Sequence, residues 1–394
     1  MSPLKISWKS ILAKPLSSAL NMLLIAFGTG ILTILLLAST QISGKLENNA
    51  KDIDLVVGAK GSPLQLILSS IYYIDFPTGN IPLKEAMELA HSPFVKKAVP
   101  LALGDNYNGV RIVGTDSNFV AVYKLGIAQG KFWQDDFEVT IGAGVAQLLN
   151  LKIGDKFYGA HGLTGTSDLH KAHEYIVKGI LKPQNNATDN LILTSVPSVW
   201  EMHEDHESTG DHEQPKELTA LLIQYRSPMS VAMFPRMVNE TTNMQAASPA
   251  QESTRLFSLI GVGVDTLQWF AVLIMLIAAS SVFVNLYNSL KERSYDLAIM
   301  RTLGASRSKL FIIVISEGIM LTIAGTLIGI ALGHLTLQII GSYQESSQAK
   351  LSGMILLFEE LYLFVAGLAI GIFAAVIPAI QAYRSNISRI LAQN

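Results

Sequence analysis

Four long apolar stretches that carry no charged residue divide the chain. They cover residues 15–44, 266–290, 318–344 and 361–383, and a charged residue bounds each of them on both sides. About 20 apolar residues are enough for a helix to cross a bilayer, so each stretch predicts a transmembrane helix. The first is too long for the apolar part of a signal peptide, and no small-residue cleavage pattern follows it, so we expect it to be retained.

The long segment between the first two apolar stretches has a mixed pattern instead. Strand-like runs with apolar alternation are separated by shorter helix-like runs and by turns rich in Gly, Pro, Asn and Asp. The predicted strands begin near residues 52, 95, 108, 139, 174, 190 and 217, and the predicted helices near 80, 197, 228 and 246. The pattern therefore predicts an α+β membrane protein, with four transmembrane helices and a large mixed α/β domain between the first and second.

Composition agrees with a membrane protein that has a sizeable water-facing part. The 394 residues are 49% hydrophobic and 15% charged, whereas about a quarter of the residues are charged in soluble domains. There is no cysteine, which excludes disulfides and thiolate metal sites. A net charge of −2 gives no reason to expect a nucleic-acid partner.

Basic residues predict the orientation of the spans. Residues 1–14, 291–309 and 384–394 together hold ten basic and two acidic residues, against 19 and 29 in the rest of the chain. Because Lys and Arg collect in cytoplasmic loops, these three pieces are predicted to be cytoplasmic and the lipid bilayer to hold the spans between them. The predicted segments are a cytoplasmic tail 1–14, a first span 15–44, a periplasmic domain 45–260, a second span 261–290, a cytoplasmic loop 291–309, a third span 310–344, a periplasmic loop 345–360, a fourth span 361–383 and a cytoplasmic tail 384–394.

The most specific motif is KERSYDLAIMRTLGASRSKL at residues 291–310. A charged start leads into a short apolar helix, and Gly304 is placed to end that helix, since Gly is favoured just past a helix C-terminus. The pattern resembles the cytoplasmic coupling segment of MacB/FtsX-type permeases, also called type VII or mechanotransmission ABC transporters. The residues that carry the resemblance, and that it implies contact an ATPase, are Glu292, Arg293, Asp296, Ile299, Arg301, Leu303, Gly304 and Ala305.

The resemblance extends along most of the chain. The ending IPAIQAYRSNISRIL (377–391) looks like the family's, except that Ile387 stands where Pro is usual. Three stretches within 110–200 look like its periplasmic core. Residues 160–173 and 201–216 do not share it.

By this resemblance the chain is a permease subunit of the bacterial inner membrane, and a homodimer is expected. The sequence has no phosphate-binding loop of the form GxxxxGK[ST], so it is predicted not to be an enzyme, to bind no cofactor itself, and to depend on a separate cytoplasmic ABC ATPase that holds ATP and Mg²⁺. A periplasmic adaptor or binding protein is a further expected partner. The family's cargoes include lipoproteins, peptides, macrolides, lipids and haem.

Two other functions fit the sequence less well. An FtsX-like regulator would convert ATP hydrolysis into activation of a periplasmic hydrolase without transport, but the external domain is larger than is usual for that role. A membrane enzyme would need a nucleophile and a base placed together, and no such set stands out in the sequence.

Glu317 and His334 stand out within the predicted third span, 310–344. Glu317 is about two turns into the predicted span, where a buried charge is costly and a partner is expected. A structural pairing with the 291–309 loop is the favoured interpretation, with cargo binding as the alternative. His334 is predicted to be an interfacial histidine near the outer end.

The stretch EMHEDHESTGDHEQ (201–214) holds three histidines and six acids. His203 and His206 share a face of one helical turn, and His212 is placed to fold back across Gly210. Imidazole and carboxylate ligands suit zinc and related divalent ions, but the spacing is not that of a closed structural site. We therefore predict a weakly bound divalent metal such as zinc. His170 and His173 are further candidate ligands, in an H-x-x-H-E order that does not match a zinc protease. The alternative is a solvated acidic loop.

Overall fold

The computed structural model describes residues 2–161, 173–207, 215–343 and 351–384. The chain divides into two compact units, a helical unit formed by the described residues of 2–41, 260–343 and 351–384, and a sheet unit formed by those of 42–259. The mixed α/β architecture and the candidate spanning helices confirm the predicted fold class.

Four helices of the described chain, with 36, 44, 37 and 25 residues, are long and apolar enough to cross a membrane. Two shorter helices, α1 and α10, complete the helical unit. The bounds are α1 Pro3–Ala13, α2 Pro15–Ala50, α9 Pro249–Glu292, α10 Ser294–Thr302, α11 Arg307–Tyr343 and α12 Glu360–Arg384. At a rise of about 1.5 Å per residue, α2 and α9 exceed the roughly 30 Å of bilayer hydrocarbon. Their far turns, 42–50 and 249–259, belong to the sheet unit.

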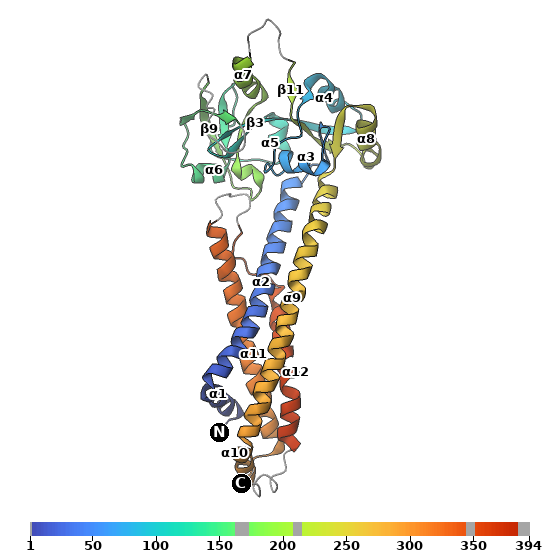
Figure 1. The fold of residues 1–394 in the computed structure, drawn as a ribbon. Coiled ribbons are helices and arrows are strands. Elements are labelled where there is room, and N and C mark those ends of the chain that lie inside the picture. Colours follow the sequence, from blue (N-terminus) through green and yellow to red (C-terminus); the bar gives the residue numbers. More distant parts are fainter. Residues whose placement is uncertain (1, 162–172, 208–214, 344–350, 385–394) are drawn as a thin grey trace. The chain divides into compact units, whose positions relative to one another are not determined.

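Small residues set the packing of the helical unit, in which α12 and α1 both pack along α11 (Figure 1). Lipid tails are as apolar as leucine, so membrane helices associate where small side chains let backbones approach. A Cβ built on Gly30 of α2 would lie 3.2 Å from the Gly329 carbonyl oxygen of α11, and one on Gly371 of α12 would lie 3.1 Å from the Thr322 Cβ. The helices therefore interlock through glycine and threonine.

The sheet unit is built on an 11-stranded mixed sheet. Its main path runs β13-β1-β12-β3-β4-β10-β6-β9-β5, with β7 on β9 and β8 on β3, and a separate two-stranded sheet joins β11 to β2. The pairs β10–β4 and β6–β9 are parallel and the others antiparallel. The strands are β1 Leu55–Ala59, β2 Ile81–Pro82, β3 Val95–Tyr107, β4 Val110–Thr115, β5 Ile127–Gly130, β6 Glu138–Ile141, β7 Lys156–Phe157, β8 Ala160–His161, β9 Tyr175–Leu181, β10 Leu191–Ser195, β11 Glu217–Leu218, β12 Ala220–Tyr225 and β13 Met244–Ala247.

Short helices cover both faces of this sheet. They are α3 Pro63–Ser70, α4 Leu83–Ala90, α5 Ser117–Val122, α6 Ala143–Leu148, η1 Ala187–Asn190, α7 Val196–Glu207 and α8 Pro228–Thr241. Alternate residues of β1 point to opposite cores, since Val56 packs with α3 and α5 whereas Leu55 and Val57 pack with α4, α7 and α8. The two-residue period of a strand buried on both faces explains why this segment is continuously apolar.

A tyrosine joins the far turns of α2 and α9 within the sheet unit. The buried Tyr72 hydroxyl lies 2.7 Å from the Ser253 hydroxyl of α9 and donates to the Leu46 carbonyl of α2 at 3.5 Å. The end of α2 is held again where Asn49 accepts the Ala187 N–H at 2.7 Å and where Asp52 pairs with Lys124 at 2.8 Å. The far turns of both helices are therefore hydrogen-bonded within the sheet unit.

A buried carboxyl group in β3 leads to a prediction about pH. Asp105 is fully buried beside a register shift in β3, and burial raises the pKa of this carboxyl to about 7. The folded state therefore binds the proton more tightly than the unfolded chain, and this contribution to stability is present at low pH and is lost as pH rises toward 7. Between about pH 4 and 7 the slope from this group is roughly 1.4 kcal/mol per pH unit.

We expect Asp105→Asn to remove that slope. Hydrogen exchange of the β3 and β4 amides in the full chain, measured by mass spectrometry across pH 4 to 8 after correction for intrinsic exchange, reports the local stability. The same decline in protection in Asp105→Asn and in the wild type would show that Asp105 is not its source.

Candidate functional site

The motif at residues 291–310 folds as helix α10 between the ends of α9 and α11. The helix ends at Thr302, and Gly304 has a φ of 98°, in the left-handed region that favours glycine. The Ala305 N–H donates back to the Met300 carbonyl at 2.9 Å, which closes a Schellman motif. The predicted role of Gly304 as the helix terminator is confirmed. The turn reverses the chain within four residues, so α10 is held between two long helices.

Helix α10 has two distinct faces. Ala298 is buried, and Leu297 and Met300 pack inward on a core cluster. The buried members of this cluster are Leu310, Ile313, Val314, Ala379 and Ala382. The outward face carries Tyr295, Asp296, Ile299 and Leu303, and Leu303 is 82% exposed. An exposed apolar stripe beside a carboxylate is the pattern of a surface that another protein covers.

Arg301, in the last turn of the same helix, has a guanidinium group whose hydrogen bonding is incomplete. Its side chain is half-buried, and its Nη1 atom is buried with no hydrogen-bond partner among the described residues. A buried, unpaired guanidinium nitrogen is costly, so a carboxylate brought by a partner would relieve it.

A polar network ties α10's start to α1 and α11. Arg293 donates to the Ser10 hydroxyl, and Ser10 in turn donates to the buried Glu317 carboxylate at 2.6 Å. Lys14 forms an ion pair with Glu292. Glu317 is thus linked to Arg293 of the 291–309 segment by hydrogen bonds through the Ser10 hydroxyl. Hydrogen bonds therefore connect the start of α10 to α1 and to the interior of α11.

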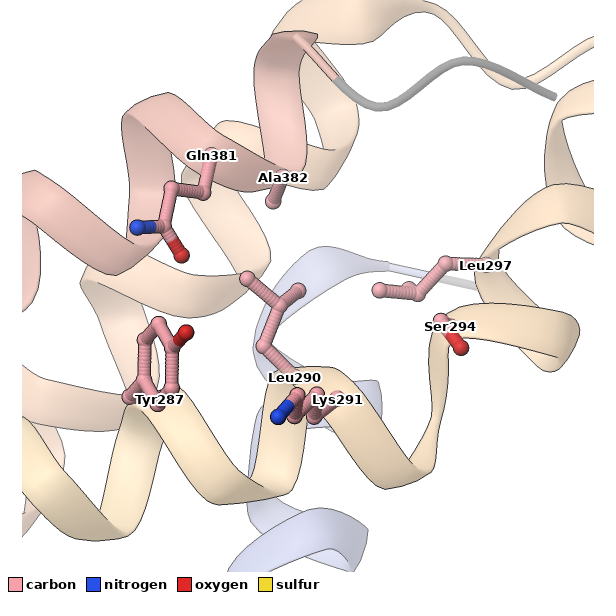
Figure 2. Close-up of a pocket in the computed structure, with 7 residues that line it drawn as sticks. All are labelled: Tyr287, Leu290, Lys291, Ser294, Leu297, Gln381 and Ala382. Atoms are coloured by element: carbon pink, nitrogen blue, oxygen red, sulfur yellow. The ribbon is translucent and has the colours of Figure 1, made fainter. Parts of the chain in front are cut away.

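A small pocket of about 180 Å³ opens beside the same segment (Figure 2). Gln381 and Ala382 of α12 face residues of α9 and α10 across it; these are Tyr287, Leu290, Lys291, Ser294 and Leu297. The lining combines leucines with polar side chains, and its small volume is below the roughly 300 Å³ usual for small-molecule sites.

Comparison with known proteins places this arrangement in a family. A family model for the MacB-like periplasmic core domain matches residues 18–241, and one for the FtsX-like permease C-terminal region matches residues 269–387. The chain belongs to the MacB/FtsX-type ABC transporter permeases. The second match contains α10, α11 and the part of α9 from residue 269, and the first contains most of α2 and most of the sheet unit.

Individual relatives of this permease are distant. It is 24% identical over 264 residues to the lipoprotein-releasing system transmembrane protein LolC of Neisseria meningitidis serogroup B, a match that spans 63% of this chain and 60% of that protein. Two solved structures also show similarity. The periplasmic region of MacB from Actinobacillus actinomycetemcomitans has 10% identity and a TM-score of 0.34, covering 54% of this chain and 97% of its own. The extracellular domain of YknZ from Gram-positive bacteria has 14% identity and a TM-score of 0.31, covering 50% and 99%.

The predicted metal ligands of the permease fall largely outside the described residues. His170 and His212 lie in undescribed stretches, and His203 and His206 lie on α7 with side chains that are not described. His173 is described, and its ring stacks on Phe137 at 4.4 Å. Among the described residues no group of three or more His, Asp or Glu side chains is placed to hold a metal ion. Metal binding by this stretch therefore stays a prediction.

Sequence reasoning missed the first helix of the permease, α1. Its signals were present, because Pro3 stands at the first helical position and Leu4, Trp8 and Leu12 recur every four residues. The contact of α1 with α11 is made by Ser7 and Ser10. The Ser7 hydroxyl lies 2.9 Å from that of Ser316. Small hydroxyl residues in a basic tail gave no hint of that contact.

Proposed function

We propose that this chain is the permease subunit of an ABC transporter in the bacterial inner membrane, with α10 and both termini in the cytoplasm and the sheet unit in the periplasm. The observation that carries the proposal is the outward face of α10, where Asp296, Ile299 and Leu303 lie exposed beside the unpaired Arg301 nitrogen. A separate cytoplasmic ATPase is the partner that covers this face. Two copies of the permease with two ATPase subunits form the working assembly.

The route of force follows the contacts. ATP-driven closure of the ATPases displaces α10, and the network of Arg293, Ser10 and Glu317 carries that displacement into α1 and α11. Helices α2 and α9 deliver motion to the sheet unit, where the Tyr72 hydroxyl bridges Leu46 and Ser253. Cargo is handled in the periplasm or the outer leaflet, and a periplasmic adaptor or binding protein receives it.

Lipid-modified proteins are the first cargo class to test. Support comes from the similarity to the lipoprotein-releasing system protein, although that match spans only 60% of the relative. Peptides, lipids, haem and metal-linked substrates are the other classes. The test is ATP hydrolysis and release by the complex in proteoliposomes, with a lipoprotein, haem, a peptide and zinc offered separately. Stimulation and release with one class supports transport. Hydrolysis that no cargo alters, together with activation of a periplasmic hydrolase, would instead favour an FtsX-like regulator.

We also propose that the histidine and acid stretch at 201–214 binds a divalent metal. Titration of the full chain in detergent with Zn²⁺ is expected to show weak binding that is lost when His203, His206 and His212 are all replaced by alanine. Replacement of His91, whose ring nitrogen lies 2.6 Å from the Met87 carbonyl elsewhere in the sheet unit, is the matched control. Equal zinc binding by the triple variant and the wild type would reject the site.

A further inference from the structure

The segment that precedes α12 presents a row of bare apolar side chains. Met354 and Leu356 are each 80% exposed and Phe358 is 76% exposed, with Ile355 between them. The row continues onto the first turns of α12, where Leu361, Tyr362 and Val365 are also exposed. Residues 353–358 carry no charged side chain, and Glu359 follows them. An apolar row of this kind would be costly in water.

The backbone of the same segment is anchored by two half-buried glutamines and one buried glutamate. Gln41 of α2 makes two hydrogen bonds of 2.8 Å to the backbone of Ser352, and Gln338 of α11 accepts the Gly353 N–H at 3.0 Å. At the other end Glu360 accepts the Leu357 N–H at 2.9 Å. Irregular backbone is tolerated at membrane depth only where its polar groups are satisfied by protein in this way.

His334 and Glu360 lock these anchors together. The His334 Nδ1 lies 2.7 Å from the Gly353 carbonyl oxygen, and its Nε2 lies 3.1 Å from a Glu360 carboxylate oxygen, with both side chains largely buried. A carbonyl only accepts, so Nδ1 carries a hydrogen. The Nε2 contact then needs one more proton, either on the ring or on the carboxyl. The pair therefore joins the loop, α11 and α12 through a shared proton.

We propose that residues 353–358 form a membrane-inserted loop whose occupant is the acyl chains of the bilayer, and that His334 and Glu360 are positioning residues that hold the loop in its inserted form. Lipid is supported because the row continues, interrupted by the exposed Glu359, into the exposed apolar side of a spanning helix. A segment is stable in hydrocarbon when its backbone polar groups are hydrogen-bonded and its exposed side chains are apolar, and this segment has both properties. The inference does not depend on the ATPase partner.

The test uses fluorescence quenching in the full chain, which has no cysteine of its own. A bimane label on Met354→Cys in lipid nanodiscs is expected to lose most of its emission when the lipids carry brominated acyl chains and little when iodide is added to the water. A label on Lys96→Cys, an exposed position of the sheet unit, is the control and should respond only to iodide.

Variants of the pair test the positioning role. His334→Ala and Glu360→Ala should shift the label at position 354 toward iodide quenching. Glu360→Gln should keep the wild-type result, since its amide donates to a neutral imidazole and its carbonyl still accepts the Leu357 N–H. If the alanine variants fail to fold, His334→Asn, which retains one of the two contacts, replaces them. Iodide quenching at position 354 as strong as at position 96, as open water would give, overturns insertion. Weak quenching by both reagents, as a covering periplasmic protein would give, overturns it as well. Alanine variants identical to the wild type overturn the role of the pair.

Discussion

The substitution Arg301→Glu is expected to abolish ATP-driven work by the permease while leaving the chain folded. The buried Nη1 of Arg301 has no hydrogen-bond partner among the described residues. We therefore expect an acidic residue of the ATPase to bind it. Losing one member of a buried charge pair costs about 2–5 kcal/mol, and reversal adds repulsion, so affinity should fall at least about 30-fold. Asp296→Lys, on the exposed side of α10, should weaken the same contact less.

Two measurements separate coupling from folding. Co-purification of the ATPase with the tagged permease reports association, and hydrolysis in proteoliposomes reports coupling. Lys309→Glu is the matched control, because it reverses an exposed charge in the same segment beyond the Gly304 turn and should behave nearly as the wild type. If Arg301→Glu and Asp296→Lys both bind and stimulate the ATPase normally, α10 is not the coupling surface.

The second large effect concerns the interlock of α2 and α11. A Cβ added at Gly329 would overlap the Thr29 hydroxyl and lie 2.6 Å from the Ala26 carbonyl oxygen. A backbone oxygen cannot move aside as a flexible side chain does, so the helices must separate. Gly329→Ala should cost at least the ~1–3 kcal/mol typical of overpacking, and Gly329→Val should prevent assembly of the helical unit.

The control for this prediction is Gly261→Ala on α9. No described atom lies within 4 Å of a Cβ built there, and alanine is about 1 kcal/mol better than glycine inside a helix. Thermal unfolding in detergent is monitored by size-exclusion chromatography with fluorescence detection. The midpoint temperature should be lower than the wild type's for Gly329→Ala and should not be lower for Gly261→Ala. Equal midpoints in the two variants would show that the α2–α11 contact is looser than described.

Features of the chain that depend on local pattern were predictable from the sequence. The charge-free runs gave the four candidate spans, and Gly304 gave the end of α10, because apolar length and a left-handed glycine are local signals. The amphipathic helix predicted from about residue 246 proved to be the start of one 44-residue helix, α9. Helix α3 was not predicted, although Ser62 as its N-cap and Pro63 after it were available signals.

Contacts between distant residues were not predictable. Tyr72 and Ser253 are separated by 181 positions, and Ser10 and Glu317 by 307. Nothing in the pattern around either residue encodes its partner, since a hydroxyl donates equally well to many acceptors. Residues 58–82 are another such case, since an apolar stretch with aromatics just after the first span fits either a contact with cargo or a partner, or a packed bridge between span and domain. The burial of Leu66, Ile71 and Tyr72 favours the bridge.

The most direct test of the account is whether ATP moves the sheet unit relative to the helical unit. Spin labels on Lys9→Cys and Lys96→Cys, two exposed lysines of the two units, report one distance when labelled chains are diluted with unlabelled ones in the complex with the ATPase. Double electron–electron resonance should show a distance distribution that shifts between the nucleotide-free and vanadate-trapped states, and no shift in Arg301→Glu. A wild-type distribution that stays the same in both states while ATP is hydrolysed would contradict the account.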